Sequence, residues 1–212
     1  RVVNLKGVIL ADNRQRLYEK IRYLTTRCNG KTADYLYYDN GYNVFRSRAV
    51  ADVPSFGEYM GVSPCGCEYN INFTLLNFFW EDNSETETEI TGTGTSYILA
   101  ANSPCAVYPK LYITPNAAPK TLTVKWATSY ITGLDTVILS ADFSSYTLAA
   151  GKYLCVDFGT GALTYETGAI LTKAITAVRR FELPPETSRI IEISGVVPSK
   201  VILKYRKNYI GV

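Results

Sequence analysis

The sequence contains no histidine among its 212 residues, and this absence excludes several kinds of active site at once. A Ser-His-Asp triad, a Cys-His pair and a histidine-ligated zinc or haem all need the imidazole, which is also the commonest general base. No run approaches the roughly 18 consecutive apolar residues of a membrane-spanning helix. We therefore expect no enzyme, no cofactor, no metal and no membrane insertion, with no catalytic or ligand-binding residue to name.

The start of the chain lacks an initiator methionine and the pattern of a signal peptide. It begins with Arg1 rather than Met, and no apolar segment typical of a signal peptide follows the basic residue. Residues 2–10 (VVNLKGVIL) already have the composition of a strand. We therefore expect that further N-terminal residues precede this sequence.

Charge is nearly balanced, with 22 Lys and Arg against 19 Asp and Glu, a net charge of +3. That excess is too small to indicate a nucleic-acid-binding protein by charge alone. Hydrophobic residues make up 47% of the chain, enough for a buried core. A single methionine and 17 tyrosines favour strand surfaces over a helical core.

Five cysteines are present, an odd number at irregular spacing, which differs from the even and dense set of a secreted disulfide framework. Cys65 and Cys67 could supply two thiolates to a metal, but a tetrahedral site needs about four ligands. Reduced structural thiols are the favoured interpretation, with metal and disulfide roles as alternatives. The five are Cys28, Cys65, Cys67, Cys105 and Cys155.

One helix is predicted, over about residues 12–28. Asp12 can cap its start with Gln15 three residues on, and Asn29 and Gly30 can end it. Its apolar residues recur with the helical period: Leu17, Ile21, Leu24 and Cys28. Basic residues occupy other positions and form either a solvated face or a surface for an acidic partner: Arg14, Arg16, Lys20, Arg22 and Arg27.

Strands are expected on both sides of the polar segment at residues 81–96. A hairpin around residues 39–41 precedes a loop at 54–66, and residues 67–75 alternate as a half-buried strand. The consecutive aromatics Phe78, Phe79 and Trp80 cannot all face one way, so at least one must meet a partner, another domain or a covering loop.

Residues 81–96 (EDNSETETEITGTGTS) are the best boundary between domains. Glu85, Glu87 and Glu89 would share one strand face, and we interpret them as a solvated acidic edge rather than an acid–base pair. From residue 97 to 205, strands follow one another with short turns, among them residues 146–148 and a hairpin around 158–161. This spacing indicates an antiparallel sandwich or barrel.

The order of several short motifs resembles phage distal tail proteins. In the second half these are residues 149–157 (AAGKYLCVD), 161–164 (GALT), 181–185 (FELPP), 190–193 (IIEI) and 201–209 (VILKYRKNY). In the first half, residues 5–9 (LKGVI), the helix start at 13–15 (NRQ) and the strand ending in residues 78–80 (FFW) fit the family's N-terminal domain. The sequence departs from the family with Glu186 after the double proline and Asn77 before Phe78.

The resemblance implies a mainly β fold with two β-sandwich domains. Residues 1–92 would form a ring-forming domain with the helix at 12–28 and without its first strands, and residues 93–212 a galectin-like antiparallel sandwich. Residues 206–212 would return to the first domain.

The function implied by the resemblance is structural. Six copies would form a ring, a baseplate hub at the virion's tail tip, assembled in the host cytoplasm. The partners would be other copies of the chain, the tail tube protein and baseplate, tail-associated or receptor-binding proteins, with DNA only as passing cargo.

Residues of the second half bear on three other functions. A carbohydrate-binding module would need a stacking ring, but Trp126 lies in phase with Leu122 and Val124, which favours the core. Ser199 and Lys200 are adjacent in a turn and do not form a catalytic dyad by themselves, and Asp157 is expected to bond to nearby backbone amides. Four basic residues near the end are interpreted as a solvated last strand: Lys200, Lys204, Arg206 and Lys207.

Overall fold

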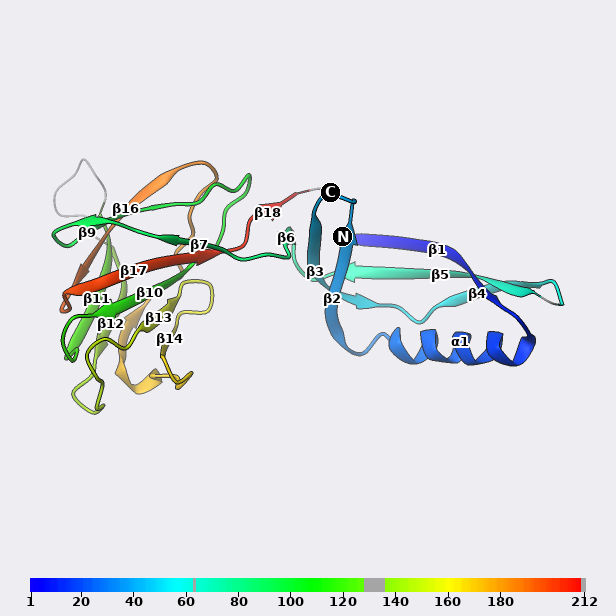
Figure 1. Cartoon of the computed structure of the whole chain (residues 1–212), viewed down its shortest axis with the longest axis horizontal. Coiled ribbons are helices and arrows are strands. Elements are labelled where there is room, and N and C mark those ends of the chain that lie inside the picture. The colour runs from blue at the N-terminus through cyan, green and yellow to red at the C-terminus, as the bar shows by residue number, and fades with distance from the viewer. Residues whose placement is uncertain (63, 128–135, 211–212) are drawn as a thin grey trace. The chain divides into compact units, whose positions relative to one another are not determined.

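The computed structural model describes residues 1–62, 64–127 and 136–210, and most of them lie in antiparallel strands. The chain divides into two compact units, Arg1–Glu81 with Ile210–Val212, and Asp82–Tyr209 (Figure 1). The predicted fold class, mainly β with a helix in the first half, is confirmed.

The first unit is built around one long antiparallel pair. Strands β1 (Val2–Ala11) and β5 (Cys65–Leu75) are in register from Val2 opposite Thr74 to Ala11 opposite Cys65. Figure 1 shows β2 and β3 running across the direction of β1 and β5. The remaining strands of this sheet in the first unit are β4 (Ser55–Met60) on β5, β3 (Val44–Ala51) on the end of β5, β2 (Ala33–Asp39) on β3, then β6 (Trp80–Asp82). The short strand β18 (Asn208–Tyr209) belongs to the second unit.

Helix α1 (Arg14–Arg27) covers one face of this sheet. Leu17 is buried against Ala11, Cys65 and Cys67, which explains the apolar period read from the sequence. The cap is Asn13, not Asp12 as predicted: the Asn13 side chain accepts a hydrogen bond from the Arg16 amide at 3.0 Å. None of the helices in the described ranges has the length and apolar character needed to cross a membrane.

The second unit is a sandwich of two sheets. Side chains from the facing strands alternate inward, and Leu111, Ile113, Leu122 and Val124 are completely buried in one common core. One sheet has the order β14 (Ala162–Tyr165), β13 (Leu154–Asp157), β10 (Lys110–Pro115), β17 (Pro198–Tyr205), β7 (Thr86–Glu89). The other has the order β15 (Ile175–Val178), β12 (Thr136–Asp142), β11 (Thr121–Ala127), β16 (Ser188–Ser194), β9 (Ser96–Ala100), β8 (Gly92–Thr93), with the 3₁₀ turn η1 (Thr172–Ala174) before β15.

Three expectations from the sequence need correction. The first domain does not extend to residue 92, because β7 pairs with β17 and thus belongs to the second unit. Residues 54–66 are not a loop, since β4 pairs with β5. Residues 146–148 are not a strand. The hairpins around 39–41 and 158–161 are confirmed by the pairs β2–β3 and β13–β14, while the return of residues 206–212 to the first domain stays a prediction.

Candidate self-assembly surfaces

The outer edge of β1 is free among the described strands, because β1 pairs with β5 alone. Four large apolar side chains along this edge strand are exposed: Val2, Leu5, Val8 and Leu10. A long apolar edge with unpaired backbone groups is a template for pairing with another chain. The first unit therefore carries a surface suited to association.

The outer edge of β4 is free in the same way, since β4 pairs only with β5 in the described part of the chain. Tyr59 and Met60 are exposed on it, and the ladder register shifts between Phe56 and Tyr59. Gly57 and Glu58 thus oppose the single residue Glu68, which is a β-bulge. The segment β4–β5–β1 therefore ends in two different open edges.

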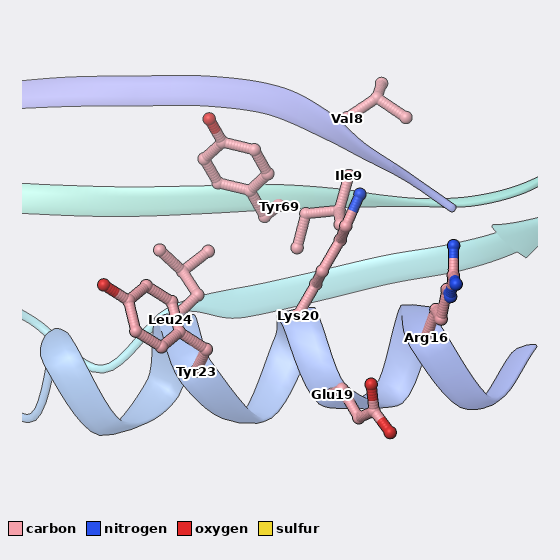
Figure 2. Close-up of a pocket in the computed structure, with 8 residues that line it drawn as sticks. All are labelled: Val8, Ile9, Arg16, Glu19, Lys20, Tyr23, Leu24 and Tyr69. Carbon is pink, nitrogen blue, oxygen red and sulfur yellow. The ribbon is translucent and has the colours of Figure 1, made fainter. Parts of the chain in front are cut away.

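A groove of about 570 Å³ lies between β1 and α1 (Figure 2). Ile9, Leu24 and Tyr69 supply apolar walls. Lys20 reaches from the helix to the strand and donates a hydrogen bond to the Leu10 carbonyl at 2.6 Å. Glu19 is the one carboxylate among the residues that line the groove, so the groove offers no carboxylate pair.

The consecutive aromatics divide as the sequence predicted. Trp80 is buried at 4% exposure beside Tyr38, with ring centroids 6.2 Å apart. Phe78 is 69% exposed, and its contact is the edge of Phe79 at 5.1 Å. One aromatic ring of the set therefore points out of the first unit into solvent.

The five basic residues of α1 are all exposed. Arg16 forms an ion pair with Asp12 at 2.7 Å, and Arg27 lies over the Tyr23 ring. Such exposed pairs contribute little stability. The two interpretations of this helix face, solvated surface and contact for an acidic partner, both remain compatible with the geometry.

The predicted acidic edge is confirmed as the edge strand β7 of the second unit. Its carboxylates meet the basic residues of the last strand: Glu87 pairs with Lys204 at 2.7 Å and Glu89 with Lys200 at 3.3 Å. The hydrogen bond that the Lys204 ammonium donates to the Glu87 carboxylate raises the pKa of Lys204. These lysines are thus neutralised within the sheet, which argues against a phosphate-binding patch.

Trp126 is half-buried rather than fully buried, and it packs against the core of the second unit. Phe181 meets the indole edge-on with ring centroids 6.2 Å apart, and the Arg189 guanidinium lies 5.5 Å from the ring centre. A sugar ring would need an open aromatic face for stacking. The arrangement does not favour the carbohydrate-binding alternative.

All five cysteines are buried and none forms a disulfide. Burial raises the pKa of the Cys28, Cys67 and Cys155 thiols, which holds them in the protonated form that neither attacks nor ligates. Within the described ranges, no group of three or more Cys, Asp or Glu side chains is placed to hold a metal ion. The thiols are packed as small apolar side chains.

Ser199 and Lys200 are not brought together for catalysis. The Ser199 hydroxyl donates to the Thr114 carbonyl at 3.0 Å, while Lys200 reaches Glu89. Asp157, as predicted, accepts hydrogen bonds from the amides of Gly159 and Thr160 at 2.9 and 3.1 Å. Its carboxylate organises the turn between β13 and β14.

Replacing Asp157 with alanine should lower the free energy of unfolding of the second unit by about 1–2 kcal/mol, because two turn amides lose their acceptor. Asp157→Asn keeps an acceptor oxygen and should recover most of that loss. Urea denaturation followed by tryptophan fluorescence gives the comparison. Equal stability of the alanine and asparagine variants would contradict the role given to the carboxylate.

Comparisons with known proteins identify solved structures that have a similar fold. No protein-family model and no curated protein sequence matches the chain. Among solved structures, the Dit (gp 19.1) protein of phage SPP1, described as a paradigm of the hub adsorption apparatus in phages that infect Gram-positive hosts, superposes with a TM-score of 0.76. The likeness covers 99% of this chain and 78% of that one, at 11% identity. The chain has the fold of a Dit-like phage hub protein.

Two baseplate structures extend the comparison. The phage P2 baseplate in its activated conformation with Ca matches 100% of this chain and 80% of its own, with a TM-score of 0.55 and 12% identity. The same baseplate with Sr matches with a TM-score of 0.54. The fold expected from the short sequence motifs is confirmed over both units.

Proposed function

We propose that this chain is a structural subunit of a phage tail tip, a baseplate hub that assembles into a ring of six copies without catalysing a reaction. The observation that carries the proposal is the Dit-like fold over 99% of the chain. The hub would join the tail tube to the baseplate or host-adhesion proteins. It would be assembled in the host cytoplasm and carried in the virion.

The open edges of the first unit support self-assembly. A ring needs two different surfaces on each copy that fit one another and a rotation that closes. The first unit offers two such edges in one sheet, β1 and β4. The second unit has its acidic edge strand neutralised, which leaves the first unit as the better candidate for the ring.

The face of the sheet opposite α1 fits a passage for DNA. Residues opposite each other in the β1–β5 ladder share a face, so Asn4, Lys6, Asn70 and Asn72 lie together. The Asn4 amide donates to Asn70 at 2.5 Å and to Asn72 at 2.6 Å. The three asparagine amides are uncharged and Lys6 is the one cation among these four residues, so phosphates can pass, whereas a row of cations would bind them strongly.

Light scattering of the full chain over a range of concentrations tests the proposal. We expect a species with six times the chain mass of 23.6 kDa, whose fraction grows with concentration. A monomer at every concentration would overturn the hub function. An enzyme or sugar-binding module needs no such assembly, so the measurement also separates the alternatives.

A further inference from the structure

We propose that the ring closes by strand pairing, with the β1 edge of one copy lying beside the β4 edge of the next. This inference rests on the proposed ring and names the surfaces that build it. Both edges belong to three strands that are neighbours in one sheet, in the order β4–β5–β1. The pairing would therefore extend this sheet from copy to copy. The occupant of each edge is thus a second copy of this chain.

The strand directions define the kind of pairing. β1 and β4 are each antiparallel to β5 and are therefore parallel to one another. Rotation about an axis roughly along the strands preserves this direction, so the new contact between copies is a parallel ladder. Because the two edges differ, the contact is heterologous and can close into a ring.

The charges of the two edges are complementary. Lys6 is the sole charged residue of β1 and Glu58 the sole charged residue of β4. Neither takes part in an ion pair within the described ranges of the chain. Lys6 lies opposite Asn70 of β5, and Glu58 lies opposite Glu68. Asn70 and Glu68 are two positions apart, so Lys6 and Glu58 are offset by about 7 Å along the strand direction. A lysine side chain spans that offset.

The apolar side chains match at one level as well. Leu10 and Met60 both lie opposite Gly66, on either side of β5. Leu10 is 63% exposed and Met60 43%. In the proposed ring, Leu10 of one copy meets Met60 of the next, which removes both from water.

A charge swap tests the interface. Lys6→Glu and Glu58→Lys each place like charges across the contact, and each should raise the concentration of half-assembly about tenfold. The double variant reverses both charges and should assemble within about twofold of the unmodified chain. Lys173→Glu, an exposed charge reversal in η1 of the second unit, is the matched control and should change nothing.

The outcomes separate this inference from the hub function. Rings that persist unchanged in both single variants would overturn the β1–β4 pairing and leave the hub function standing. A monomeric unmodified chain would overturn both. A double variant as impaired as the singles would also overturn the pairing.

Hydrogen exchange of the unmodified chain gives a readout that needs no variant. The β1 and β4 amides that do not bond to β5 should become protected on assembly, and their continued exchange in the ring would contradict the pairing.

Discussion

Replacing Trp80 with alanine is expected to abolish assembly while the second unit stays folded. Trp80 is 4% exposed, and it packs beside Tyr38 in a first unit with few buried side chains. Removing a buried tryptophan costs about 3–5 kcal/mol, a large part of the stability of a small unit. Without a folded first unit, the β1 and β4 edges cannot form.

The chain has two tryptophans, and this makes the Trp80→Ala experiment selective. In the variant, fluorescence comes from Trp126 alone, so its urea transition reports the second unit and should match that of the unmodified chain. Light scattering should find monomers, and hydrogen exchange should show lost protection in β1 and β5. Trp80→Phe keeps an aromatic ring and should retain rings at higher concentration. Intact rings of Trp80→Ala would contradict the account.

Replacing Leu111 with alanine is expected to have the converse effect. Leu111 is completely buried in β10, between the neighbouring strands β13 and β17. The substitution leaves a cavity in the core of the second unit and should cost about 3 kcal/mol of its free energy of unfolding. Introduced beside Trp80→Phe, which leaves Trp126 as the one tryptophan, the substitution should move the fluorescence transition to lower urea concentration.

Trp80→Ala and Leu111→Ala should differ in their effect on ring assembly. Leu111→Ala leaves both open edges of the first unit intact, so rings should form at the concentrations of the unmodified chain. Leu111→Met, which nearly conserves volume, is the control and should cost less than about 1.5 kcal/mol. Loss of rings in Leu111→Ala under conditions where the second unit is still folded would show that the second unit builds the ring.

Periodicity predicted the elements that bury one face. The alternation from Cys67 to Leu75 corresponds to β5, and the spacing of Leu17 and Ile21 corresponds to α1. The sequence does not distinguish the helix start to the residue, because Asp12 and Asn13 are both good caps and their chain order does not say which side chain turns back to the amides. The outward aromatic was also predictable, because three consecutive rings on an extended chain cannot share one face.

The elements that sequence reasoning missed are edge strands. Residues 55–60 (SFGEYM) do not alternate, contain a glycine and are mostly exposed, so the ladder with β5 is what makes them a strand. The acidic segment was predicted to be an edge, but its place in the second unit was not, since its partner β17 lies near the end of the sequence. The proposed interface was therefore not readable from the sequence: its two charges, Lys6 and Glu58, become related only through their common neighbour β5.

Negative-stain images of the full chain at high concentration test the central claim most directly. The account predicts closed particles with six-fold symmetry in projection. Open filaments would mean that the heterologous contact forms but its rotation does not close. Isolated two-unit particles at every concentration would contradict the account.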